Sequence, residues 1–184
     1  ALEVLDLSGA RRLTARGWEA LARGLSPAAR AGLRVLRVVD CAGLDGERVA
    51  ALLGGPTPGP GQAPLRALRV LQLACGARTS WGTSEALEAA LRAGCLPSLR
   101  VLHLDGLDMR VELADALRGS GVEELSVPHG SMSEAAAAAV GASLRSMPRL
   151  RSAEALGEEP DPGAARALVN AVVAEPAPRR LRSV

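Results

Sequence analysis

The 184-residue chain has no phenylalanine, tyrosine, isoleucine or lysine, and two tryptophans are its only large aromatic side chains. Because lysine is absent, the chain has no phosphate-loop lysine, no Schiff-base residue and no side-chain amine nucleophile. The shortage of aromatic rings removes the stacking surfaces that bind single-stranded nucleic acid. The core must be built from leucine, valine and alanine, which bury little area each, at roughly 25 cal/mol per Å².

The motifs of common catalytic and metal sites are also missing. The sequence contains no C-x-x-C, no H-E-x-x-H, no calcium-loop spacing and no G-x-S-x-G elbow. The segment Gly59-Pro60-Gly61 lacks the third glycine of a dinucleotide-binding fingerprint. We therefore expect that the protein is not an enzyme and that it uses no cofactor and no metal.

Charge, hydropathy and cysteine spacing limit the environment of the protein. The net charge of +2 is too small to indicate a nucleic-acid partner, and no run reaches the ~18 apolar residues that a membrane span requires. No secretory signal opens the sequence. The cysteines Cys41, Cys75 and Cys95 have no paired spacing, which favours free thiols and a reducing compartment. These features predict an intracellular, cytoplasmic protein.

A six-residue pattern, L-x-V-L-x-[LV], recurs along the chain. Four clear copies begin at residues 2, 33, 68 and 99, looser copies begin at 122 and 150, and a last one begins at 181. Alternating apolar positions within each copy predict a short parallel strand, and recurrence near 30 residues indicates stacked structural repeats. The segment Gly54–Pro64 has eight Gly or Pro in eleven residues and explains the longest spacing. We interpret it as an inserted linker, with a proline-rich docking site as the alternative.

Helical spacing of apolar residues follows each predicted strand. The N-cap positions fit side chains that accept a hydrogen bond from the first turn, and these are Thr14, Asp45, Ser84, Ser133 and Asp161. The predicted buried helix faces include Trp18 and Leu21, then Val111 and Leu113, and finally Leu168 with Val172. One strand–helix unit cannot bury its own apolar face, so neighbouring units must supply the core.

The first repeat closely resembles the ribonuclease-inhibitor-like class of leucine-rich repeats. Its L-T-x-x-G-x-x-x-L segment, with Leu13, Thr14, Gly17 and Leu21, matches the strand-to-helix passage of that class. The resemblance implies an α/β fold that forms a right-handed leucine-rich-repeat solenoid, a horseshoe arc with a parallel β-sheet on the concave face and helices on the convex face. We expect one such domain over residues 1–184, as part of a longer chain.

The sequence departs from that class at the ninth repeat position. The class usually places Asn or Cys there, where the side chain caps backbone groups of the loop. The ninth positions of this chain are Ala10, Cys41, Gly76, Leu107 and Gly130, so only Cys41 fits. We therefore expect irregular loops, and a thinner core in the sixth repeat, where Ala153 and Ala155 occupy leucine positions.

Stacked repeats turn equivalent positions into columns of side chains. Outward positions three, five and seven define our candidate partner-binding residues on the concave face: Val35, Arg37, Val70, Gln72, Val101, His103 and Asp105. The valines are either an apolar binding stripe, which we favour, or residues selected for strand propensity. His103 and Asp105 are either a base with its orienting carboxylate or, as we favour, a pair joined by an exposed surface hydrogen bond on a binding sheet.

Position two of the repeats gives a row of arginines, Arg34, Arg69 and Arg100. Like charges at strand spacing repel one another unless anions neutralise them. This row therefore pairs either with local carboxylates, which we favour, or with an external anion such as an acidic protein, RNA phosphate or lipid headgroup.

The leading hypothesis is a non-catalytic protein–protein interaction scaffold that binds a protein through its concave sheet, or through docked ends, in a larger intracellular assembly. The resemblance leaves a regulatory function open, because repeats of this class also occur in activators of small GTPases, in substrate receptors of ubiquitin ligases and in innate-immune sensors.

Overall fold

The computed structural model describes residues 2–54, 63–74, 80–107, 109–128 and 133–156, together with positions 163 and 166. Several sequence predictions concern residues outside these ranges: most of the inserted linker, Cys75, Gly76, Gly130, the Asp161 cap, the helix with Leu168 and Val172, and the repeat at residue 181.

The described residues form six strands and six helices. In chain order they are β1 (Val4–Asp6), α1 (Ala15–Gly24), α2 (Pro27–Gly32), β2 (Val35–Val39), α3 (Gly46–Leu53), β3 (Val70–Ala74), α4 (Ser80–Arg92), β4 (Val101–Asp105), α5 (Val111–Leu117), β5 (Glu124–Pro128), α6 (Glu134–Ser146) and β6 (Ser152–Leu156). Each strand begins at the third position of a predicted repeat, so all six predicted strands within the described residues are confirmed.

The strands form a single all-parallel sheet in the order β1-β2-β3-β4-β5-β6. Equivalent repeat positions are direct neighbours, as in the row Val35, Val70 and Val101. The structure is therefore an α/β fold with one six-stranded parallel sheet, and at least one helix lies in every crossover.

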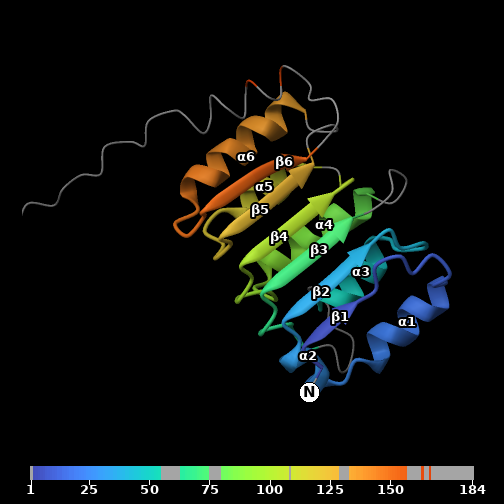
Figure 1. Cartoon of the computed structure of the whole chain (residues 1–184). Helices are drawn as coiled ribbons and strands as arrows, with labels where there is room; N and C mark the ends of the chain where they lie inside the picture. Colours follow the sequence, from blue (N-terminus) through green and yellow to red (C-terminus); the bar gives the residue numbers. More distant parts are fainter. Residues whose placement is uncertain are drawn as a thin grey trace, which may run out of the picture.

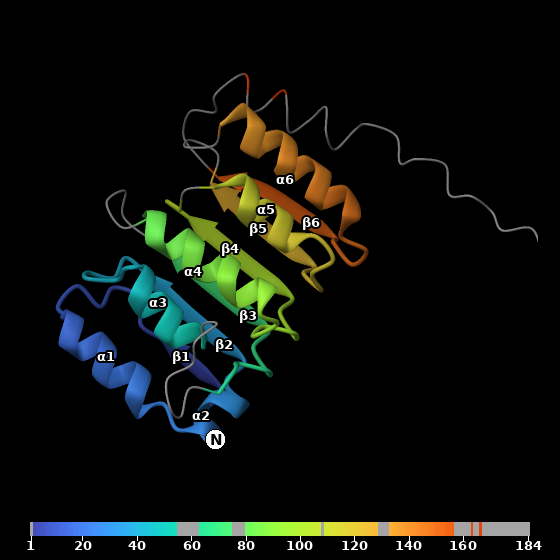
Figure 2. The same cartoon turned by 180° about the vertical axis from the view of Figure 1, so that it is seen from behind.

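All six helices lie on one face of this sheet, as the two opposite views show (Figures 1 and 2). They follow one another in the order of the strands, and no described helix or strand covers the opposite face, which we call the open face (Figure 1). Strand side chains alternate between the two faces. The residues of one repeat are therefore divided between a helix-covered interior and the open face.

The core lies between the sheet and the helices and consists mainly of leucine. The inward positions Leu36, Leu71 and Leu102 are each no more than 1% exposed. Trp18 of α1 is also buried, and its indole Nε1 donates a hydrogen bond to the carbonyl oxygen of Ala42 at 3.0 Å. Ala153, which replaces a leucine in β6, is exposed, and the thinner core of the sixth repeat stays a prediction, because most of the residues that follow β6 lie outside the described ranges.

Helix starts agree with most of the predicted caps. The side chains of Thr14, Asp45 and Ser133 each accept a hydrogen bond from a backbone N–H in the first turn. The prediction for Ser84 is wrong, because α4 begins at Ser80 and Ser84 is buried inside the helix. The sequence analysis also missed α2, which Ser26 caps.

One predicted core residue is also wrong. Val111 is 38% exposed, because it is the first residue of the short helix α5, whereas Leu113 and Leu117 of the same helix are buried.

The ninth repeat position points into the structure where it is described. Cys41 Sγ lies 3.0 Å from the carbonyl oxygen of Leu7 and 3.5 Å from that of Val39, so this thiol contacts the loop backbone as expected. Leu107 occupies the same position and is completely buried. An apolar side chain thus fills this position, as the sequence showed, and the loop amides there need partners other than a side-chain cap.

A buried arginine joins separate parts of the fold. Arg30 of α2 is 0% exposed, and it donates hydrogen bonds of 2.7 Å to the carbonyl oxygens of Ala63 and Leu52. Burial lowers its pKa. Cys95 Sγ donates a hydrogen bond of 3.0 Å to the carbonyl oxygen of Gly54 nearby. These two side chains satisfy carbonyls at the end of α3 and on both sides of residues 55–62, where a helix C-terminus leaves acceptors without partners.

Helices α3 and α4 approach most closely at a pair of glycines. A Cβ atom on Gly46 collides with the carbonyl group of Gly82, and a Cβ atom on Gly82 lies only 3.2 Å from the Cα of Gly46. The two backbones are therefore in contact, and the pairing requires glycine because of space.

We predict that Gly46→Ala lowers the free energy of unfolding by about 1–3 kcal/mol, because the two helices must move apart. Gly24→Ala is the matched control, since no atom lies within 4 Å of an added Cβ there; it should be neutral or slightly stabilising. Urea unfolding of the two variants measures the difference. Equal effects of the two substitutions would contradict the close contact.

Alkaline pH gives a second test of the fold, because the chain has no lysine and no tyrosine to titrate between pH 8 and 11. Burial raises the pKa of the Cys95 and Cys41 thiols above the usual value of 9.0. The unfolded chain therefore loses these protons first, and stability that is present below pH 9.0 declines as the pH rises above it.

We expect the free energy of unfolding of the wild type to fall between pH 7.5 and 10. Cys95→Ala should show a smaller fall over the same interval, since one buried thiol has been removed. Urea titrations at both pH values measure this difference. A decline in the variant as large as that of the wild type would show that Cys95 is not protected by the fold.

Candidate interaction surface on the open face

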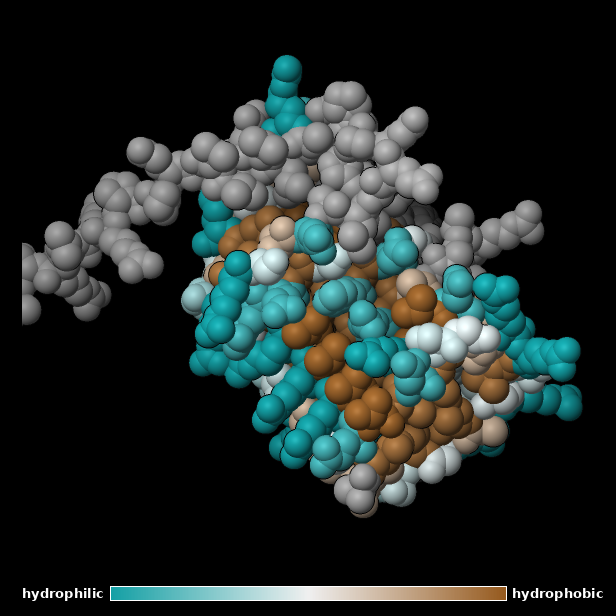
Figure 3. All heavy atoms as spheres, in the orientation of Figure 1, coloured by the Kyte–Doolittle hydropathy of each residue, from teal (hydrophilic) through white to brown (hydrophobic). Residues whose placement is uncertain are grey.

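Four valines form a continuous column across the open face. Val4, Val35, Val70 and Val101 are neighbours in register on β1 to β4. Val4 is 52% exposed, and the other three are partly exposed. Figure 3, which views the open face, shows hydrophobic surface between hydrophilic side chains. The column predicted from the sequence is thus present, and it ends at Glu124 on β5.

A polar column lies beside the valines at the fifth repeat position. It runs through Asp6, Arg37, Gln72 and His103 in register. Arg37 pairs with Asp6 at 3.5 Å, with both side chains 45% exposed. Hydrogen bonds from Ser8, and then the Arg37 guanidinium, lower the pKa of Asp6. This charge pair is exposed and contributes little to stability.

His103 and Asp105 are both in the described part of the chain, and no hydrogen bond joins them, so the predicted surface hydrogen bond between them is wrong. His103 is half-buried, Asp105 is exposed, and Asp105 pairs in register with Ala74. Ser126 lies next to His103 in register and is 3% exposed, but its Oγ has no hydrogen-bond partner. The three side chains therefore share a face without the nucleophile–base and base–carboxylate hydrogen bonds of an acyl-transfer triad.

The arginine row lies at the edge of the sheet where the strands begin. Backbone hydrogen bonds connect the row: Arg69 N–H donates to the Arg34 carbonyl at 2.8 Å, and Arg100 N–H donates to the Arg69 carbonyl at 2.9 Å. Figure 3 shows hydrophilic side chains along this edge beside the hydrophobic surface. The predicted row and the predicted valine column are therefore neighbours.

Within the described ranges, carboxylates pair with the two outer members of the row and not with the middle one. Arg34 pairs with Glu3 at 3.6 Å, and Arg100 pairs with Glu123 at 3.5 Å. Glu123 also lies 3.9 Å from Arg151. Arg69, in the middle, is exposed and makes no side-chain hydrogen bond or ion pair with any described residue. The interpretation that local carboxylates neutralise the row is confirmed for Arg34 and Arg100 and is wrong for Arg69.

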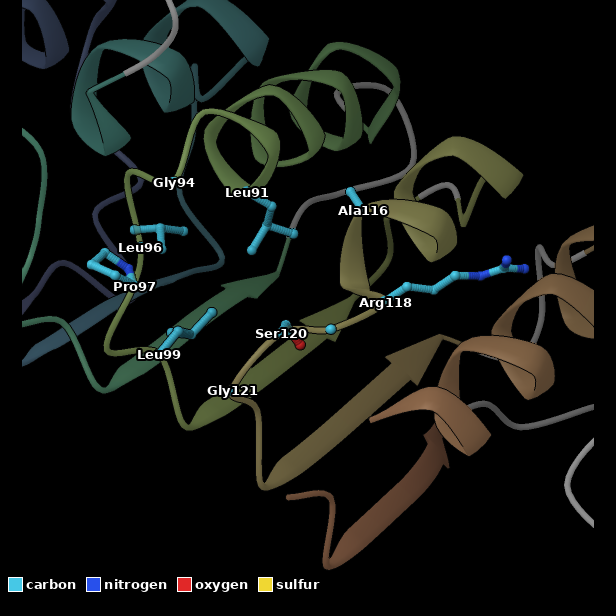
Figure 4. Close-up of a pocket in the computed structure, with 10 residues that line it drawn as sticks. Leu91, Gly94, Leu96, Pro97, Leu99, Ala116, Arg118, Ser120 and Gly121 are labelled. Carbon is cyan, nitrogen blue, oxygen red and sulfur yellow. The ribbon is translucent and has the colours of Figure 1, made fainter. Parts of the chain in front are cut away.

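A pocket that the sequence analysis missed lies on the helix side of the sheet. It has a volume of about 220 Å³ and sits between the C-terminal ends of α4 and α5 (Figure 4). Leu91, Leu96 and Leu99 line it, Ser120 contributes a buried Oγ without a partner, and Arg118 extends away from it. The sequence feature that could have indicated this pocket is the short spacing of 23 residues between the repeats that begin at 99 and 122. This spacing leaves room for a helix of only seven residues, α5.

Two further features of the described residues bear on partners. No group of three or more His, Cys, Asp or Glu side chains there is arranged to hold a metal ion. None of the helices among them is long and apolar enough to cross a lipid bilayer.

Comparison of the sequence with protein-family models found no match, and comparison with curated proteins found none either.

The assignment of the two faces makes a prediction about stability. Leu71→Ala should lower the free energy of unfolding by about 2–5 kcal/mol, because it opens a cavity in a buried site. Val70→Asp, one residue earlier, should cost about 1 kcal/mol, since its effect is mainly lost strand propensity on an open face. Urea unfolding measures both changes. A larger cost at Val70 than at Leu71 would reverse the assignment of the faces.

Proposed function

We propose that the chain is a leucine-rich-repeat domain of the ribonuclease-inhibitor-like class, a right-handed solenoid with the open face on its concave side. Three observations support this proposal. The strands follow chain order in one parallel sheet, each crossover carries a helix on the same face, and Cys41 contacts the loop carbonyls from the ninth repeat position. Stacked repeats with these properties bury a continuous core between neighbours.

The function we propose is that of a non-catalytic scaffold that binds a partner protein on the open face. The observation that carries it is the valine column, which leaves partly exposed apolar side chains on the one sheet face that no described helix covers. Parallel sheets are normally covered on both faces. A contiguous apolar strip with a polar border is the usual composition of a protein-binding surface.

The polar groups beside the valines support a protein partner rather than a nucleic acid. Asp105, Glu124 and Glu154 are exposed carboxylates on β4, β5 and β6 of the same sheet, and they would repel a phosphate backbone. Gln72 and His103 make no hydrogen bond with any described side chain, so they are available to a partner.

Substitution on the two faces tests this function. In the native host, the tagged chain with Val70→Asp and His103→Arg should lose its co-purifying partner. The control combines Ala138→Asp with Ala20→Arg, which makes equivalent changes at exposed positions of α6 and α1, and should retain that partner. Circular dichroism should show that both variants remain folded.

Crosslinking then locates the contact directly. A benzoylphenylalanine side chain in place of Gln72 should crosslink to the partner, and the same group in place of Ala138 should not. Retention of the partner by the open-face variant, or crosslinks from position 138 alone, would refute binding through the open face.

A further inference from the structure

The charge on the open face is unevenly distributed around the valine column. On the side where the strands begin lies the arginine row, and on the other side lies a polar column in which Asp6 pairs with Arg37, followed by Gln72 and His103. A partner that covers the valines therefore meets positive charge along one border only. This asymmetry indicates that the partner carries negative charge along that border.

The positive charge is concentrated at the centre of the row. Arg34 turns to Glu3 on the β1 side, and Arg100 turns to Glu123 on the β5 side, so both carboxylates lie on the outer side of their arginines. Arg69 lies between these two arginines and has no carboxylate of its own among the described residues. Because ion pairing neutralises the two flanking arginines, Arg69 is the unpaired cation of the row.

The length of the valine column sets the length of the apolar part of the contact. Val4 to Val101 spans three steps between strands, or about 14 Å. That length accommodates three or four apolar side chains of a short segment. Arg69 immediately precedes Val70 at the middle of the column, so one anionic group of the same segment reaches it while the apolar side chains cover the valines.

The amount of positive charge selects the kind of anion. A single unpaired arginine can bind one carboxylate, because a planar guanidinium donates two parallel hydrogen bonds to it. A polyanion such as RNA needs several unpaired cations to bind. On this face it would also be repelled by the exposed carboxylates of Asp6, Asp105 and Glu124. The local charges therefore favour an acidic protein segment over a phosphate backbone.

We propose that the open face selects a partner segment in which an aspartate or glutamate stands beside apolar side chains, with the carboxylate on Arg69 and the apolar groups on Val35, Val70 and Val101. This inference rests on the proposed function and specifies the chemistry of the partner. Arg69 is then the residue that determines specificity, and the valines supply most of the buried area.

Four synthetic probes, three peptides and one RNA, test the proposal on the full chain. The peptides are fluorescein-labelled and twelve residues long; the first carries one central glutamate among leucines and serines, and the second has glutamine and the third has lysine at that position. A twelve-nucleotide uridine RNA is the fourth probe. Fluorescence anisotropy at low salt should give an affinity for the glutamate peptide about ten-fold higher than that for the glutamine peptide, and higher than that for the lysine peptide or the RNA.

The charge reversal Arg69→Glu should lower the affinity for the glutamate peptide at least about ten-fold and should raise that for the lysine peptide. Arg16→Glu is the matched control, because Arg16 is an exposed arginine in the first turn of α1 on the helix side, and it should leave all affinities within about two-fold. The wild-type affinity for the glutamate peptide should also fall only gently with added salt, as expected for one ion pair.

Several results would overturn the proposal. They are equal binding of the glutamate and glutamine peptides, equal effects of Arg69→Glu and Arg16→Glu, tighter binding of the RNA, or no binding of any peptide. None of these results decides the proposed function, which the crosslinking from position 72 tests separately. A crosslinked native partner together with any of these results would retain the scaffold and remove the acidic segment.

Discussion

The stacking of leucine side chains from neighbouring parallel strands is the interaction on which the rest of the structure depends. Leu36, Leu71 and Leu102 lie next to one another in register, and the helices cover them completely. Because strand side chains alternate, burial of these leucines fixes which residues reach the open face. A shift of register by one residue would exchange the two sets. The core and the proposed binding surface are therefore two consequences of one arrangement.

The composition of the chain determines how this core is packed. Without phenylalanine, tyrosine or isoleucine, the interior consists of smaller side chains, and contact is maintained by close approach of the backbones. Gly46 and Gly82 show this between α3 and α4. Three backbone carbonyls at the ends of the repeats are satisfied individually, by Arg30 at Leu52 and Ala63 and by Cys41 at Leu7. The regular part of the fold is thus apolar, and these polar contacts differ from one repeat to the next.

The strands, their order of pairing and the four valines could be predicted because each repeat contains the same local pattern. The start of α4 could not, since Ser84 has the side chain of a cap but is buried inside the helix, which begins four residues earlier at Ser80. The Ser26-Pro27 signal for α2 was present in the sequence and was overlooked. Burial of Arg30 depends on carbonyls that are 22 and 33 residues distant in the chain. Arg69 likewise lacks an ion pair because Glu3 pairs with Arg34 and Glu123 pairs with Arg100. No local sequence pattern predicts which arginine each glutamate pairs with.

Solvent exposure of methyl groups in the folded chain tests the central claim most directly. With leucine and valine methyls labelled for nuclear magnetic resonance, a soluble gadolinium chelate broadens the signals of methyls that water can reach. The account predicts strong broadening for Val35, Val70 and Val101 and protection for Leu36, Leu71 and Leu102. Protected valines with broadened leucines, or equal broadening of both sets, would contradict it.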